Sequence, residues 1–367
     1  MNDSSHHRPR PIPLRPDNFT PASRTPWGGR RIVQHFKADI LGPGRDLNAV
    51  VGESWELSAG PEFPSFASDG RALSELLAED PAAMLGDELG AGRSQTALLV
   101  KWLDAAEPLS LQIHPTDAQV RQPDASGKPE CWYVVDCEPG ATLVHGFQPG
   151  TTEARVREAL EAGAGLEALL CRIPVQRGDL VVLDPGTPHA VGAGITLIEP
   201  QRVLPGRRGL TYRYWDYGRR YDGDGRPDPH GQLRPLHLEE ALAVTDWDRA
   251  SDPAWLSSRR RACGWPDTAL PARHELLCGP EPDALLDFAP LRVERLGGSG
   301  HLELPERRVL RCLTVVEGTI VLGTGAAALR LQAGCSAALP AGLPPLELEL
   351  LAAHALLSSI APAPAAP

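Results

Sequence analysis

The sequence predicts a mainly β protein made of two related β-barrels with short helical segments. It contains 36 Gly and 37 Pro among 367 residues. Because Gly and Pro interrupt helices and favour turns, this content suits short strands and turns better than long helices. The length favours two modules, and a 42% apolar content is enough to bury a core. An internal repeat pairs CWYVVDCEPG and VQRGDLVVLDPGTPH with CLTVVEGTIV and LQAGCSAALPAGLPP.

Leucine-rich helical periodicity predicts three helices, and β-branched or alternating runs predict the strands. The predicted helices are 71–92, 152–171 and 235–250. The predicted strands are 53–58, 97–103, 109–114, 130–136, 180–183, 196–199 and 311–322.

Changes in composition along the chain predict its organisation. The two ends are polar or Pro-rich and carry too little apolar surface to pack, so we expect them to be flexible tails. The predicted units are a tail (1–16), an N-terminal barrel with helical inserts (17–234), a helical connecting segment (235–290), a C-terminal barrel-like domain (291–360) and a tail (361–367).

Charge and cysteine usage exclude several classes of protein. The formal net charge of −11 disfavours a polyanion-binding surface, so we expect no nucleic-acid partner. The seven cysteines form no CxxC pair and are odd in number, which is typical of buried reduced thiols. The N-terminus has no apolar leader segment, and no apolar stretch approaches ~20 residues. We therefore expect a cytoplasmic protein without membrane contact, and a monomer by default.

Four polar side chains have the chemistry of a metal site. Alternation along a strand places Ser110, Gln112 and His114 on one face. Glu130 opens a later strand, and His189 follows the tight turn Asp-Pro-Gly-Thr-Pro. Two imidazoles, a carboxylate and an amide suit a borderline cation such as Zn²⁺ with one position left open, and Mn²⁺ or Fe²⁺ accept the same ligand types.

The order of these ligands, QxH, a carboxylate and then PGTPH, resembles the two-part metal motif of the cupin superfamily of jelly-roll barrels. Six segments in one order further resemble the type I mannose-6-phosphate isomerases, in their short bacterial form. The segments cover roughly residues 20 to 220 and read WGGR, GESWELS, LSLQIHP, KPECWY, PGTPHA and TYRYWDYG.

The resemblance implies a zinc-dependent isomerase that interconverts mannose 6-phosphate and fructose 6-phosphate through a cis-enediol, as part of carbohydrate metabolism. The family's ligands to one Zn²⁺ per chain fall on the four candidate residues, Gln112, His114, Glu130 and His189. In the implied mechanism the metal polarises the sugar oxygens, while protein groups move a proton between C2 and C1.

Further site residues follow from the same resemblance. Arg213 matches an active-site arginine that stabilises the enediolate, and Lys128 and Glu199 match other catalytic positions. Ser110 and Trp27 match substrate-binding positions, with Ser110 expected at the phosphate. The proton-transfer base remains open among Glu199, Lys128 and a metal-bound water. The residues that hold the phosphate also remain unassigned, although the basic turn 205–210 is a candidate.

The internal repeat predicts that the C-terminal module lacks a metal. Aligning Val134-Val135-Asp136 with Val315-Val316-Glu317 puts Arg311 opposite Glu130, and aligning the glycine turns puts Pro344 opposite His189. Neither replacement is a metal ligand. Two alternatives to the isomerase stay open: another metal-dependent cupin, either an oxygenase or an isomerase of a different sugar phosphate, and a non-catalytic cupin that binds sugar phosphates.

Overall fold

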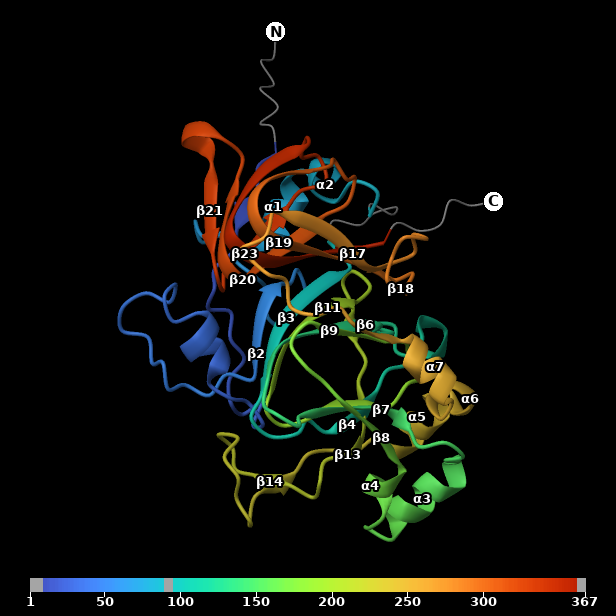
Figure 1. The fold of residues 1–367 in the computed structure, drawn as a ribbon. Helices are drawn as coiled ribbons and strands as arrows, with labels where there is room; N and C mark the ends of the chain where they lie inside the picture. Colours follow the sequence, from blue (N-terminus) through green and yellow to red (C-terminus); the bar gives the residue numbers. More distant parts are fainter. Residues whose placement is uncertain (1–8, 89–94, 362–367) are drawn as a thin grey trace.

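The first of the three large β-sheets formed by the described residues has six antiparallel strands. The computed structural model describes residues 9–88 and 95–361 (Figure 1), so residues 89–92 of the first predicted helix and the outermost tail residues lie outside it. The strand order is β16-β9-β6-β11-β3-β2. The bounds are Arg260–Ala262, Asp179–Leu183, Glu130–Cys137, Ile195–Arg202, Leu98–Ala105 and Glu53–Leu57.

A five-stranded sheet faces the first one, in the order β13-β4-β10-β7-β8. A core that includes Trp132, Val181 and Leu183 from the first sheet and Leu143 and Val191 from the second lies between them. Sheets packed in this way form the antiparallel sandwich expected of a jelly roll. The bounds are Tyr212–Trp215, Leu111–Ile113, His189–Val191, Thr142–Phe147 and Leu170–Pro174.

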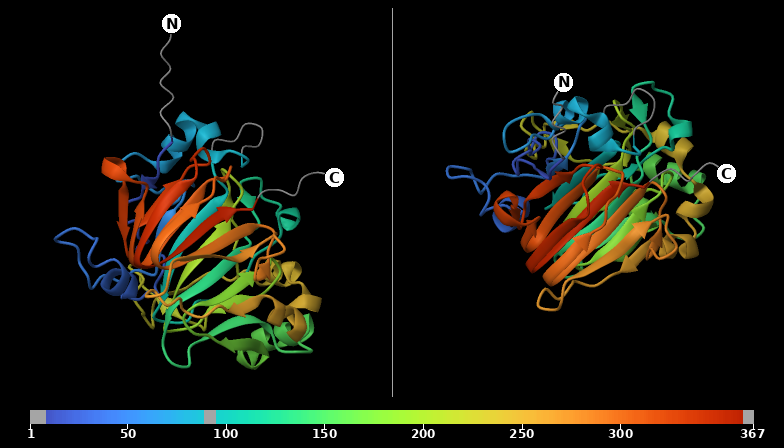
Figure 2. Two further views of the ribbon diagram at one scale, coloured as in Figure 1. Left: turned by 45° about the horizontal axis from the view of Figure 1, so that its top comes forward. Right: turned by 90° about the horizontal axis from the view of Figure 1, so that it is seen from above.

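The C-terminal sheet has eight strands, ordered β1-β22-β20-β23-β19-β17-β18 with β21 beside β20. One face packs on the six-stranded sheet through a second core that joins Trp102 and Tyr133 to Leu291 and Cys312, and the strands of the two sheets lie side by side in Figure 2. The other face carries its own core, which includes Leu313. The bounds are Ile12–Pro13, Ser336–Leu339, Arg311–Leu322, Leu346–Ile360, Leu291–Leu304, Arg273–Gly279, Leu286–Asp287 and Leu329–Gln332.

The helices are short, and most cover the outer face of the five-stranded sheet. The remaining short elements are two strand pairs and three single helical turns. The helices are α1 Leu73–Glu79, α2 Pro81–Leu85, α3 Glu153–Glu161, α4 Leu166–Leu169, α5 Leu238–Val244, α6 Trp247–Ala250 and α7 Pro253–Ser258. The pairs are β5 Ala125–Ser126 with β12 Arg208–Gly209 and β14 Arg220–Tyr221 with β15 Gln232–Leu233, and the turns are η1 Ile32–Phe36, η2 Asp117–Gln119 and η3 Gly325–Ala327.

The fold class is confirmed as mainly β, but each predicted helix is interrupted. The first breaks at Asp80, whose side chain caps α2 ahead of a proline. The second breaks at Gly163 and Gly165, which have φ of 64° and 88°. The third breaks before α6, which Asp246 caps. Local capping and glycine turns therefore override the continuous leucine pattern.

The C-terminal sheet recruits residues from outside the predicted range 291–360. Ile12 pairs with Ala338, so part of the predicted N-terminal tail is a strand. The predicted connecting segment contains α5 to α7 but also β17. Hydrogen bonds between distant strands determine which segments join the C-terminal sheet, and amino-acid composition carries no information about these bonds. Among the described residues, no helix is long and apolar enough to cross a membrane.

The internal repeat is reproduced in the strand registers. Glu130 pairs with Leu183 in the first sheet, and Arg311 pairs with Leu339 in the third. The two glycine turns also match, because the Gly178 amide donates to Val134 O at 2.8 Å and the Gly334 amide donates to Val315 O at 2.9 Å. Leu339 is the equivalent of Leu183, and His189 lies six residues after Leu183. The residue six positions after Leu339 is Pro345, so Pro345 is equivalent to His189 instead of the predicted Pro344. The prediction that the C-terminal module lacks a metal is unchanged by this shift, because neither proline is a metal ligand.

Candidate metal centre and active-site cavity

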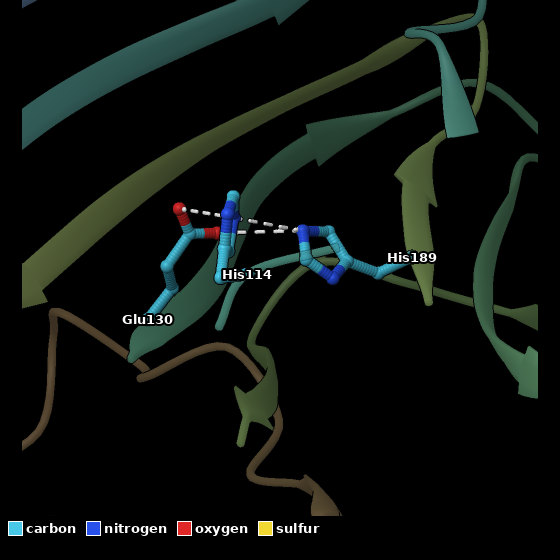
Figure 3. Close-up of side chains that lie close together, drawn as sticks. All are labelled: His114, Glu130 and His189. Atoms are coloured by element: carbon cyan, nitrogen blue, oxygen red, sulfur yellow. Dashed lines mark hydrogen bonds and ion pairs between the residues drawn. The ribbon is translucent and has the colours of Figure 1, made fainter. Parts of the chain in front are cut away.

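Three of the four predicted ligands meet between the two N-terminal sheets. Glu130 begins β6, His189 begins β10, and His114 follows β4. His114 Nε2 lies 3.1 Å from Glu130 Oε1, and His189 Nε2 lies 3.8 Å from Glu130 Oε2 (Figure 3). All three side chains are buried, and they form the group of possible ligands found among the described residues. Strands far apart in the sequence thus bring one carboxylate and two imidazoles together.

Backbone carbonyls fix both imidazoles in the tautomer that binds a metal. Nδ1 of His114 lies 2.8 Å from Leu210 O, and Nδ1 of His189 lies 2.8 Å from Thr187 O. Because a carbonyl only accepts, each Nδ1 carries the proton and each Nε2 keeps its lone pair. The two Nε2 atoms face each other at 3.1 Å. Facing lone pairs repel, and a cation between them removes that repulsion, so this donor set fits a metal.

The electrostatics of the three groups also favour a cation. Burial is the main cause that lowers the pKa of His114, and burial likewise lowers the pKa of His189 to about 3, so both rings are neutral. Burial alone would raise the pKa of Glu130, but the positive charge of Lys128 holds it well below its ordinary value. Neutral imidazoles and an ionised carboxylate are the protonation states that ligate divalent metals.

Gln112 reaches the same place through the register of the five-stranded sheet. It pairs with His189 on one side and with Arg213 on the other, and directly paired residues point to the same face of a sheet. Its side-chain amide nitrogen donates to Ser110 Oγ at 3.1 Å. The amide oxygen is therefore the atom left to act as a ligand.

A cavity of about 280 Å³ lies beside these groups. Seven of the nine predicted site residues line it. His114 is tied to the lining through Glu130 and His189, whereas Ser110 is fully buried behind it. The seven are Trp27, Gln112, Lys128, Glu130, His189, Glu199 and Arg213.

Lys128, Glu130 and Glu199 belong to one buried polar network. Lys128 Nζ contacts Glu130 Oε1, and Gln201 Nε2 donates to the same oxygen at 3.0 Å. Trp132 Nε1 donates to Glu199 Oε1 at 2.8 Å. Burial and the nearby Glu130 charge raise the pKa of Glu199 to about 8. Glu199 therefore holds a proton near neutral pH, whereas the neighbouring Glu130 carboxylate is ionised.

Arg213 is held by Ser110 and by the following loop. Its Nε donates to Ser110 Oγ at 3.1 Å, and its Nη1 donates to Pro235 O at 2.7 Å. Ser110 thus accepts hydrogen bonds from both Gln112 and Arg213. This fully buried serine positions two cavity residues instead of lining the cavity itself.

Several cavity residues were not predicted. Lys101 Nζ lies 3.6 Å from Glu53 Oε1 and 4.0 Å from Glu199 Oε2, and Arg24 also lines the cavity. Glu53 stands in the GESWELS segment, so that motif was a signal for its role. Lys101 is an isolated lysine in an apolar strand, and only the β3–β11 pairing with Glu199 reveals its place.

A second, smaller cavity of about 150 Å³ adjoins the first and shares Arg24, Lys101 and Lys128 with it. The predicted basic turn contributes Arg207 and Arg208 to its wall. The five cationic side chains that line this second cavity make a favourable environment for a dianion.

Comparisons with known proteins agree with this geometry. The family described as "Phosphomannose isomerase type I, catalytic domain" matches residues 21–137. The mannose-6-phosphate isomerase of Streptococcus mutans is 34% identical over 238 residues, which cover 63% of this chain and 68% of that protein. Mannose-6-phosphate isomerase ManA of Bacillus subtilis is 30% identical over 309 residues, which cover 82% of this chain and 86% of that protein.

Solved structures extend the similarity to the whole fold. The crystal structure of the mannose 6-phosphate isomerase from Bacillus subtilis aligns with a TM-score of 0.72 and 25% identity, covering 95% of this chain and 99% of that one. The apo phosphomannose isomerase from Salmonella typhimurium has a TM-score of 0.63 at 15% identity and supports the fold alone. With the His114–Glu130–His189 centre and the matched relatives, the chain belongs to the type I mannose-6-phosphate isomerase family.

Proposed function

We propose that this chain is a metal-dependent isomerase that interconverts mannose 6-phosphate and fructose 6-phosphate. One observation carries the proposal: the Nε2 lone pairs of His114 and His189 meet the Glu130 carboxylate beside a cavity. Arg213 and Lys128 line the same cavity. These groups supply the two requirements of aldose–ketose isomerisation, which are stabilisation of an enediolate and proton transfer between adjacent carbons.

The metal in this proposal is one Zn²⁺ held by Gln112, His114, Glu130 and His189. A bound zinc ion supplies a Lewis acid that polarises the carbonyl and hydroxyl oxygens of the sugar. The donor set of two nitrogens and two oxygens suits zinc with an open position. One metal per chain is expected, because Arg311 and Pro345 stand at the equivalent C-terminal positions.

Proton transfer between C2 and C1 through a cis-enediol needs a group that both takes and returns a proton. Glu199, with a pKa of about 8, and Lys128 line the cavity and belong to one network with Glu130. Arg213 keeps its charge at all working pH values and faces the same cavity, so it stabilises negative charge that develops on the sugar oxygens. We assign proton transfer to the Glu199–Lys128 pair and charge stabilisation to Arg213.

The phosphate lies toward the second cavity in this proposal. Arg207 and Arg208 line that cavity, and Lys101 and Lys128 line both. A phosphate dianion gains most from several cations that are already in place. The catalytic unit is then the N-terminal pair of sheets, formed by residues 17–234 together with the edge strand β16 from the following segment. The C-terminal module is its packing partner in a monomeric cytoplasmic enzyme.

A coupled assay for fructose 6-phosphate with parallel metal analysis tests the function. The wild type loaded with zinc should convert mannose 6-phosphate, His114→Ala should lose both metal and activity, and Arg213→Ala should keep metal but lose activity. A zinc-loaded wild type that binds the sugar phosphate without turnover would identify a binding protein instead. Turnover that depends on dioxygen would identify an oxygenase.

A further inference from the structure

A row of buried polar residues crosses the C-terminal sheet at the end that corresponds to the metal centre. Arg292 on β19 pairs with Ser359 on β23, and Ser359 pairs with Arg311 on β20. Directly paired residues project from the same face, so the small serine separates two arginines on one surface. The three residues are 6%, 1% and 1% exposed.

Several donors in this row have no acceptor among the described residues. Arg311 Nη1 donates to Pro305 O at 3.1 Å, but Arg311 Nε and Nη2 have no partner. The same is true of Arg292 Nε and Ser359 Oγ. Buried polar groups are nearly always hydrogen-bonded, and an unpaired buried charge is especially unfavourable. The free Nε–Nη2 edge of Arg311 is the edge of a guanidinium that binds two oxygens of a carboxylate or phosphate.

The charges around the row leave an excess of positive charge. Glu294 Oε1 accepts from Arg292 Nη2 at 2.9 Å and from His274 Nε2 at 3.0 Å, and it lies 3.8 Å from Arg307 Nη2. Arg292 Nη1 also contacts Glu281, whose other carboxylate oxygen is turned toward Gly279. Arg292, Arg307 and Arg311 therefore face two carboxylates, so one positive charge has no counterion in the part of the chain that the structure describes.

The position of Arg311 connects this row to the metal centre. Arg311 occupies in the β20–β22 pair the register that Glu130 occupies in the β6–β9 pair. The N-terminal module places an anionic side chain there and suits a cation. The C-terminal module places a cationic side chain there, so the polarity of the equivalent site is inverted.

We propose that Arg292, Arg311 and Ser359 form a site for a small oxyanion, such as a phosphate or carboxylate group, in the C-terminal module. The anion accepts two hydrogen bonds from the Nε–Nη2 edge of Arg311 and further ones from Arg292 Nε and Ser359 Oγ. His274 and Arg307, with side chains 24% and 31% exposed, mark the side from which it enters. The site lies on the face of the C-terminal sheet turned away from the catalytic sheets, because Arg311 and Leu313 share that face.

Thermal unfolding of the full zinc-loaded chain tests the site, with sodium phosphate, acetate and chloride compared at equal ionic strength. Phosphate at about ten times its Kd should raise the unfolding midpoint of wild type by on the order of 2 °C relative to chloride. A similar rise in the unfolding midpoint with acetate would show that a carboxylate group also binds this site. Arg311→Met should lower this increment to the part that phosphate binding in the catalytic cavity supplies. Arg311→Lys keeps the charge but lacks the Nε–Nη2 edge, and it should weaken phosphate binding at the C-terminal site at least about tenfold.

Arg308→Met is the matched control, because the Arg308 side chain is 73% exposed on the loop that precedes β20, and it should respond to phosphate like wild type. An equal phosphate response in wild type and Arg311→Met would place the anion elsewhere, including the catalytic cavity, and would overturn the proposal. If Arg311→Met does not fold, a crystal of the wild type soaked in selenate tests whether an oxyanion binds at Arg311. Anomalous density within hydrogen-bond distance of Arg311 Nε and Nη2 supports the site, and water alone at that position rejects it.

Discussion

His114 and His189 present their Nε2 atoms to each other at 3.1 Å, and each ring donates its Nδ1 proton to a backbone carbonyl. Neither ring turns away without leaving that carbonyl and a buried N–H unpaired. The fold thus holds two lone pairs in opposition beside the Glu130 carboxylate. Such a site is stabilised by a bound cation, and this has consequences for stability as well as for activity.

Removal of the metal should lower the stability of the folded chain. A chelator should reduce the unfolding midpoint of wild type by several degrees, because a ligand that binds only the folded state stabilises it. His114→Ala should bind zinc at least about 100-fold more weakly and show no further response to the chelator. His301→Ala, at an exposed position, is the control. Identical midpoints with and without chelator in zinc-loaded wild type would contradict the prediction.

Ser110→Ala should lower kcat while the zinc content stays near one per chain. The change leaves Gln112 Nε2 and Arg213 Nε without their shared acceptor, at a cost of about 1 to 3 kcal/mol in the positioning of these groups. We expect a fall in kcat of about tenfold or more, measured in the coupled assay. Thr116→Ala, on an exposed turn, should behave like wild type. A change confined to KM would instead indicate direct contact with the phosphate, as the sequence resemblance suggests.

Gly178→Ala should destabilise the chain strongly. Gly178 has φ of +89°, and an added Cβ would overlap the Gly264 carbonyl and lie 2.9 Å from Trp265 N. Gly140 has a similar φ of +80° but open space around it, so Gly140→Ala isolates the backbone strain. Urea unfolding should show a loss of about 1 kcal/mol for Gly140→Ala and about 3 kcal/mol or more for Gly178→Ala. Equal losses would mean that the contact with Gly264 relaxes freely.

Glu88→Gln should remove a pH-dependent loss of stability. Burial raises the pKa of Glu88 to about 7, although Thr96 Oγ1 and the amides of Ala97 and Leu310 donate to the carboxyl group. In the unfolded chain this group titrates near its ordinary value. Between the two pKa values the folded state retains a proton that the unfolded state has lost, so stability is present below about pH 4.5 and is lost as the pH rises to about 7.

The expected size of this loss is about 2 to 3 kcal/mol in the free energy of unfolding between pH 5 and pH 8. The total loss should be smaller by this amount in Glu88→Gln, in which the loss caused by Glu199, with a pKa of about 8, remains. It should be unchanged in Glu79→Gln, whose side chain is exposed. Unfolding of the three proteins at both pH values provides the measurement. Parallel pH profiles for wild type and Glu88→Gln would show that Glu88 stays ionised in the folded chain.

Much of the site was predictable because strand alternation and turn chemistry are local. The QxH alternation placed Gln112 and His114 on one face of the same strand segment, and the Pro-Gly turn placed His189 at the start of a strand. Lys101 was not predictable, because its neighbours Glu53 and Glu199 come from strands about 50 and 100 residues away. The role of Ser110 was also hidden, since burial depends on what packs over a residue.

The sequence by itself determined the β character and the candidate ligand residues, because periodicity, turn residues and repeated motifs are local features of the chain. Tertiary structure alone decided that Ile12–Pro13 would join the C-terminal sheet and that Ser110 would bridge Gln112 and Arg213. It also decided that Arg311 would be buried in the register of Glu130, with two donors that have no acceptor in residues 9–88 and 95–361. These features arise from hydrogen bonds and burial between distant segments, which no local pattern encodes.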